Sequence, residues 1–196
     1  MPTDVELDGR RLRREQNREA VLEALCTLHA EGRYEPGIAA IAERAGLSPR
    51  SVFRYFDDID DLTRAAIHRQ LAQAQPLVDL DVAADEPLAV RIRAVVEQRC
   101  RLFEATGPPA RAARVCAHRL PLVADQVHQA RTFLRQQLLR VFAPELAGAG
   151  AVLLPAVDAL CSFETHELLR GNQGLSRPET VAALTEALTA LLEAQT

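Results

Sequence analysis

Hydrogen-bond donors suited to phosphates and to the edges of nucleic-acid bases are concentrated between positions 48 and 55 of this 196-residue chain. The planar guanidinium of Arg50 can donate two hydrogen bonds to O6 and N7 of a guanine. Arg54 can bind a base or a phosphate, and hydroxyl groups suit phosphate oxygens, which fix position without selecting sequence. Either arginine taken alone could also be an ordinary solvated side chain. The candidate contacts are Ser48, Pro49, Arg50, Ser51, Arg54 and Tyr55.

Two short helices joined by a tight turn must position these donors, and the sequence predicts them at Ile38–Ala45 and Ser48–Phe56. Glycine tolerates the left-handed backbone that follows a helix end, so Gly46 is expected to end the first helix. Ser48 is a good N-cap, and Pro49 suits the first helical position because its missing N–H is not needed there. This layout is typical of a DNA-binding helix-turn-helix, whose second helix enters the major groove. A helical hairpin that only packs against its neighbours is the alternative.

Composition and periodicity predict an all-α fold. Hydrophobic residues make up 48% of the chain, charged residues 26% and aromatic residues only 4%, which favours helices over sheets. We expect a disordered acidic tail at residues 1–9, a helix-turn-helix domain with its connecting fourth helix at 10–75, and a larger helical domain at 76–196. Pro76 and Gly107 are expected to end long helices.

The same segment carries a family resemblance through Ala45-Gly-Leu-Ser48, Ser51-Val-Phe-Arg-Tyr-Phe56 and Leu62. Together these residues resemble the N-terminal signature of the tetracycline-repressor (TetR) family of bacterial transcriptional regulators. The match covers about residues 10–70, and the rest of the chain is similar only in length and helical pattern. The resemblance implies a three-helix DNA-binding domain followed by a ligand-binding and dimerisation domain, in a homodimeric repressor that binds a palindromic double-stranded DNA operator.

Three positions depart from the family pattern, and each departure removes a phosphate anchor. Phe53 stands where a tyrosine is usual, Ile59 where a lysine is usual, and Gly37 where a serine or threonine usually opens the second helix. Four acidic residues nearby are also expected to repel DNA unless they point away: Asp57, Asp58, Asp60 and Asp61. We therefore expect weaker or more salt-sensitive DNA binding than is usual in the family, or compensation from another segment.

The expected compensation is a run of four arginines, Arg10, Arg11, Arg13 and Arg14. The resemblance implies that the segment before the first helix can reach along DNA, and arginine suits a narrow minor groove. Residues 10–56 carry nine arginines against six glutamates, a net charge of +3, whereas the whole chain has a net charge of −4. DNA binding through one small face needs only such a basic patch. A frayed, solvated helix end is the alternative.

Residues 76–196 admit two interpretations, a helical bundle with a solid core and the ligand-binding and dimerisation domain that the resemblance implies. Helices expected at 152–170 and 178–193 have apolar faces and form the predicted homodimer interface. A small apolar effector is expected to lie among the helices of residues 87–170. The polar or reactive residues that are candidates to line this pocket are Cys100, Cys116, His118, Arg119, His128 and His166.

Other classes of function lack support in the sequence. No phosphate-binding loop, nucleophile motif or carboxylate pair stands out, so we expect neither an enzyme nor a cofactor. Cys116 and His118 would point in nearly opposite directions on a helix, so no metal site is expected. The four cysteines, without a secretory signal, are expected to be reduced thiols in the cytoplasm, and no apolar stretch approaches the roughly 20 residues that cross a bilayer. The alternative function is a ligand-binding or protein-interaction module of the same fold with degraded DNA contacts.

Overall fold

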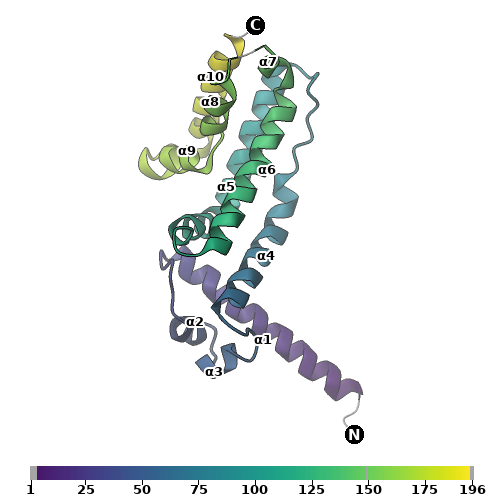
Figure 1. The fold of residues 1–196 in the computed structure, drawn as a ribbon, viewed down its shortest axis with the longest axis vertical. Helices are drawn as coiled ribbons and strands as arrows, with labels where there is room; N and C mark the ends of the chain where they lie inside the picture. The colour runs from purple at the N-terminus through teal and green to yellow at the C-terminus, as the bar shows by residue number, and fades with distance from the viewer. Residues whose placement is uncertain (1–3, 149, 195–196) are drawn as a thin grey trace. The chain divides into compact units, whose positions relative to one another are not determined.

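The computed structural model describes residues 4–148 and 150–194, which form helices, turns and loops without a strand (Figure 1). The all-α prediction is therefore confirmed. The chain forms two compact units, one made of residues 1–73 and 107–127 and the other of residues 74–106 and 128–196. The first junction is close to the expected boundary at 75, but residues 107–127, expected in the second domain, group with the first unit. None of the described helices is both long and apolar enough to cross a membrane.

The first unit is built on the long helix α1 (Asp4–Ala30), with α2 (Ile38–Arg44), α3 (Pro49–Val52) and the first part of α4 (Ile59–Val78). Helix α1 begins earlier than predicted. It includes residues 4–9, which were expected to form a disordered tail. Acidic residues in the first turns of a helix interact favourably with its dipole, which accounts for the earlier start. Residues 1–3 of that predicted tail lie outside the described residues.

A small apolar core holds these four helices together. Arg69 of α4 also forms ion pairs with Glu19 and Glu23 of α1, and its Nε lies 2.6 Å from the Glu19 carboxylate. Pro76 lies inside α4 and does not end it, because the fixed φ of proline is compatible with a helical backbone. Val52 and Phe56 face the core as part of this buried cluster: Val21, Leu22, Ala24, Leu25, Leu28, Ile41, Ala42, Val52, Phe56, Leu62 and Ala65.

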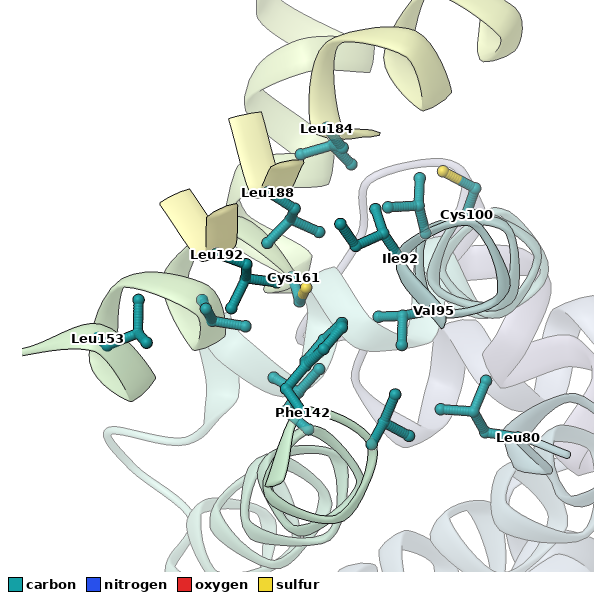
Figure 2. Packing of buried hydrophobic residues seen from close by; sticks show 14 residues of the cluster. Leu80, Ile92, Val95, Cys100, Phe142, Leu153, Cys161, Leu184, Leu188 and Leu192 are labelled. Carbon is teal, nitrogen blue, oxygen red and sulfur yellow. The ribbon is translucent and has the colours of Figure 1, made fainter. Parts of the chain in front are cut away.

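The second unit combines most of α5 (Leu88–Cys116) and α6 (Pro121–Val141) with a C-terminal group of helices. These are α7 (Ala143–Leu146), α8 (Leu153–Leu160), α9 (Phe163–Glu167), the π-helix η1 (Leu168–Asn172) and α10 (Arg177–Glu193). Figure 2 shows Leu184, Leu188 and Leu192 of α10 pointing into the core toward Ile92 and Val95 of α5. Leucine and valine side chains from several helices thus form one apolar core.

Two expectations for this part of the chain were wrong. Helix α5 continues through Gly107, Pro108 and Pro109, although each proline removes a helical hydrogen bond and crowds the preceding turn, so tertiary context here outweighs local propensity. The single helix expected at 152–170 is divided into α8, α9 and η1. The division follows from Ser162, whose side chain accepts a hydrogen bond from the N–H of Thr165 and caps a new helix.

Candidate nucleic-acid interface

Helix α3 presents its polar residues to solvent from a fixed starting point. Gly46 has a φ of +69°, and the Ser48 side chain accepts a hydrogen bond from the N–H of Ser51, so the predicted turn and N-cap are both confirmed. The Ser48 and Ser51 hydroxyls also lie 2.9 Å apart. Val52 is fully buried, which anchors the opposite side of the helix in the core. The exposed side chains on α3 and just after it include Ser48, Pro49, Arg50 and Arg54.

The second helix of the motif is shorter than predicted. Helix α3 ends at Val52, and the chain continues to Tyr55 as turns. The N–H groups of Arg54 and Tyr55 donate to carbonyls three residues back, those of Ser51 and Val52, at 3.1 and 2.9 Å. These tighter bonds belong to 3₁₀-type turns, which often end α-helices. The main chain therefore keeps a helix-like path to Tyr55 although the regular α-helix is only one turn long.

A side chain that the sequence analysis missed holds Tyr55 in place. Asn17 Nδ2 of α1 donates a hydrogen bond of 2.9 Å to the Tyr55 hydroxyl oxygen. The Tyr55 hydroxyl keeps its own proton for donation to another acceptor, such as a phosphate oxygen. The contact joins residues that are far apart in sequence, so no local pattern could have indicated it.

A surface hollow of about 660 Å³ lies beside this hydrogen bond. It brings two of the four N-terminal arginines together with the end of the α3 segment, and its lining contains three guanidinium groups and no carboxylate. Guanidinium groups grouped in this way suit a phosphate backbone. The lining residues are Arg13, Arg14, Asn17, Arg54 and Tyr55.

The N-terminal arginines lie on α1 and not on a separate arm. Arg11, Arg13 and Arg14 are exposed, and Arg13 Nε donates to the Gly9 carbonyl oxygen of the preceding turn at 3.2 Å. The side chain of Arg10 lies outside the described part of the chain. Since the segment is helical, any contact it makes with DNA comes from the side of a helix.

The positions that lack phosphate anchors are open to solvent. Phe53 is 54% exposed and Ile59 is 47% exposed, so two apolar side chains stand in water where the resemblance implies polar ones. Gly37 is the N-cap of α2 and supplies no side-chain hydrogen bond. The three losses that the sequence indicated are thus present as surface features of the first unit.

Two of the four nearby aspartates serve the start of α4. Asp58 Oδ1 accepts a hydrogen bond of 2.7 Å from the Asp61 N–H, and Asp61 Oδ2 accepts one of 3.2 Å from the Asp57 N–H. These two bonds satisfy one N–H in the first turn of α4 and one just before it, and they place negative charge at the positive end of the helix dipole. Part of the acidic cluster therefore has a local structural role, and its charge is partly offset there.

Comparison with known proteins identifies this part of the chain. Residues 21–66 match the family described as bacterial regulatory proteins, tetR family. The chain carries a TetR-family DNA-binding domain. The match runs from the second half of α1 through α2 and α3 into α4, and it supports DNA binding of the kind found in this family of transcriptional regulators. No curated protein matches the chain.

The six candidate residues for a ligand pocket are divided between the two units. Cys116, His118 and Arg119 belong to the first unit, whereas Cys100, His128 and His166 belong to the second. Within the first unit, Cys116 donates to the Tyr34 carbonyl oxygen at 3.3 Å and Arg119 pairs with Glu35 at 2.7 Å, while His118 is exposed. Within the second, Cys100 and His166 are buried and His128 is exposed. A role of any of them in ligand binding stays a prediction.

The described cysteines are unpaired thiols. Burial raises the pKa of Cys161 to about 12 and also raises the pKa values of Cys100 and Cys116. A thiol reacts as its thiolate, so these buried cysteines are protonated and unreactive at neutral pH. No cluster of three metal-ligating side chains occurs among the described residues.

Proposed function

We propose that this TetR-family regulator binds a palindromic operator as a homodimer and acts as a ligand-responsive repressor. The observation that carries the proposal is the capped α3, which exposes Arg50, followed by Arg54, which lines a hollow together with Arg13 and Arg14 of α1. In a dimer, two such helices would contact half-sites separated by one helical turn of DNA or a multiple of it. As the sequence indicated, the proposed contacts are Arg50 on a base, Tyr55 on a phosphate, and Arg13 and Arg14 in a narrow minor groove.

We place dimerisation and effector binding in the C-terminal part of the chain, within residues 76–196. Exposed Val152 and Leu168 support this, since large apolar side chains in water favour burial against a partner. The effector changes DNA affinity only through its different affinities for two states of the dimer, typically by about 1–3 kcal/mol. A cytoplasmic location follows from this proposal, because a repressor must reach chromosomal DNA.

A selection experiment tests the proposal with the full chain. A randomised duplex pool is incubated with purified protein at low and moderate salt, and the bound duplexes are sequenced. An enriched palindrome supports a sequence-specific dimer. No enrichment at either salt concentration contradicts the proposal and favours a ligand-binding or protein-interaction module, for which the exposed Phe53 and Ile59 are the motivating observation.

Arg50→Ala is expected to cost about 1–3 kcal/mol of binding free energy and to relax the preference at one base pair per half-site. The reason is the loss of a guanidinium that donates two hydrogen bonds to one base, which no other α3 residue can replace. The measurement compares duplexes selected by the wild type and the variant. Arg93→Ala in α5, where the side chain is highly exposed, removes the same charge and should leave the enriched sequence unchanged. Equal selection by wild type and Arg50→Ala would remove Arg50 from the interface.

Ile59→Lys is expected to tighten binding to all duplexes and to steepen the dependence of log K on log salt by about one. The substitution restores a cation at the start of α4, where the side chain is 47% exposed. Leu71→Lys is the matched control, because it adds the same charge to an exposed site of the same helix. That site lies about 18 Å further along α4, beyond the Debye length of about 10 Å at 0.1 M salt. An identical slope for the wild type and Ile59→Lys would show that α4 does not approach the DNA backbone.

A further inference from the structure

Two arginines of α5 are buried in the second unit, and they differ in their partners. Arg91 is 4% exposed and donates to both carboxylate oxygens of Glu145, at 2.7 and 2.5 Å. Arg99 is 2% exposed, yet no carboxylate of the described residues lies within ion-pair distance of it. Guanidinium groups remain charged in proteins, so Arg99 is a buried positive charge that forms no ion pair, although the charge of Asp158 favours it from a greater distance.

Neutral oxygens surround part of the Arg99 guanidinium. Its Nη1 donates to Oε1 of Gln98 and to Oε1 of Gln137, the latter at 2.9 Å, and its Nη2 donates to the Leu134 carbonyl oxygen at 2.9 Å. Its Nε is buried and has no hydrogen-bond partner. Burial lowers the pKa of Arg99, and the charges of Cys161 and Asp158 oppose this shift only in part. The charge and one donor are therefore left for a further acceptor.

The two glutamines that accept from Arg99 hold the end of α4. Gln98 Nε2 donates to the Leu77 carbonyl oxygen at 2.9 Å, and Gln137 Nε2 donates to the Val78 carbonyl oxygen at 2.6 Å. The last carbonyls of a helix have no partner within the helix, so these two amides satisfy groups that would otherwise be exposed or orphaned. The guanidinium fixes which way both amides point, because it requires their oxygens to face it.

Apolar groups make up the surroundings of this network. Val95 and Val96 precede Arg99 by four and three residues on α5, so they lie on the same face of the helix, and both are buried. Cys100 and Leu138 belong to the same buried cluster as these two valines. A ligand that reached Arg99 would meet a cation at one point and hydrocarbon around it.

We propose that Arg99 binds the carboxylate of an effector whose remaining part is apolar, and that this binding alters the end of α4. The inference rests on the proposed function and names its effector class. A carboxylate matches the fork of a guanidinium with two oxygens, and an anion is the group that a buried cation lacks. Once the guanidinium binds the carboxylate, it no longer fixes Gln98 and Gln137, and the caps on Leu77 and Val78 weaken. Helix α4 continues from these residues into the first unit, which provides the link to DNA binding.

Matched small molecules test the site in the full-length wild-type chain. The probes are octanoate, butanoate and benzoate, with octanol as the neutral counterpart and inorganic phosphate as an anion without an apolar part. We expect the best carboxylate to raise the thermal transition seen by circular dichroism in a saturable way, with octanol and phosphate binding at least tenfold more weakly. Stabilisation by octanol equal to that by octanoate overturns the proposal. So does tighter binding of phosphate, or the absence of binding by every carboxylate.

Variants test the residue itself. Arg99→Gln removes the charge, Arg99→Lys keeps the charge but loses the fork, and both are expected to bind octanoate at least tenfold more weakly. Arg101→Gln is the matched control, because Arg101 is half exposed on the same helix and is expected to bind like the wild type. Full octanoate affinity in a folded Arg99→Lys and Arg99→Gln overturns the assignment. The comparison of octanoate with octanol in the wild type decides the question if these variants do not fold.

The DNA assay separates this inference from the proposed function. With a duplex selected by the chain, saturating octanoate is expected to weaken binding by about tenfold in the wild type and not in Arg99→Gln. If octanoate binds through Arg99 but the selection enriches no duplex, the anion site is supported and the proposed repressor function is contradicted. If the selection enriches a duplex but no carboxylate binds, the repressor function is supported and the anion site is contradicted.

Discussion

Arg91→Met is expected to lower the free energy of unfolding of the second unit by about 3–5 kcal/mol. The side chains of Arg91 and Glu145 are only 5% and 11% exposed, so the substitution leaves a buried carboxylate without its cation. It also removes donors from the carbonyl oxygens of Glu86 and Val141, at 2.7 and 2.9 Å. Breaking one side of a buried pair costs more than the pair contributes, because the remaining charge has no water to solvate it.

This prediction includes a pH dependence whose sign follows from Glu145. The guanidinium of Arg91 lowers the pKa of the Glu145 carboxyl from its ordinary value of 4.5. A lowered folded-state pKa stabilises the fold above the ordinary value, and the stabilisation is lost as the pH falls through the folded-state pKa. In Arg91→Met this contribution is absent. The difference in stability between wild type and variant should therefore be largest near neutral pH and shrink below about pH 4.5.

Two spectroscopic signals distinguish the units in this measurement. The chain has two tyrosines and no tryptophan, and both Tyr34 and Tyr55 belong to the first unit. Tyrosine fluorescence therefore follows the first unit, whereas far-ultraviolet circular dichroism follows all helices. Arg93→Met is the control, because Arg93 is 76% exposed and pairs with Glu97 at the surface. That variant should change stability by no more than about 0.5 kcal/mol. Equal losses of stability in Arg91→Met and Arg93→Met would contradict the argument that burial makes the Arg91–Glu145 pair costly to break.

The features that the sequence predicted well are those set by neighbouring residues. The left-handed Gly46, the Ser48 cap and the capping box of Ser176 and Glu179 each depend on a few adjacent positions, and each is present. The helix-turn-helix and the family resemblance could be predicted from such local features, because the glycine, the cap and the buried aromatic residue lie at fixed spacings along the sequence. Local chemistry is what a single sequence records most directly.

Features that depend on tertiary packing were predicted poorly. Gly107 and the prolines after it disfavour a helix locally, yet α5 continues through them. The contact of Asn17 with Tyr55 joins two segments that only the fold brings together. Arg99 did leave a signal that went unused, since an arginine follows Val95 and Val96 on an apolar helical face. A charged residue on such a face indicates either a buried partner or a ligand.

The largest effect expected in the first unit comes from Phe56→Ala, which should lower its free energy of unfolding by about 3–5 kcal/mol. Phe56 is 2% exposed within the core of the DNA-binding domain, so the substitution leaves a cavity the size of an aromatic ring. It also removes the contact of the Arg18 guanidinium with the ring, whose centroid lies 5.0 Å away. The variant should shift the transition seen by tyrosine fluorescence to lower temperature.

Phe53→Ala provides the matched control, since it deletes the same ring three residues earlier from a side chain that is 54% exposed. Its effect on stability should stay within about 0.5 kcal/mol, because no core contact is lost. Phe56→Ala should in addition abolish duplex binding at temperatures where the first unit has unfolded, and restore it on cooling. Phe56 is too buried to touch DNA. Loss of binding would therefore show that Phe56 acts by holding α3 in place. Equal shifts for the two variants would contradict the assignment of Phe56 to the core.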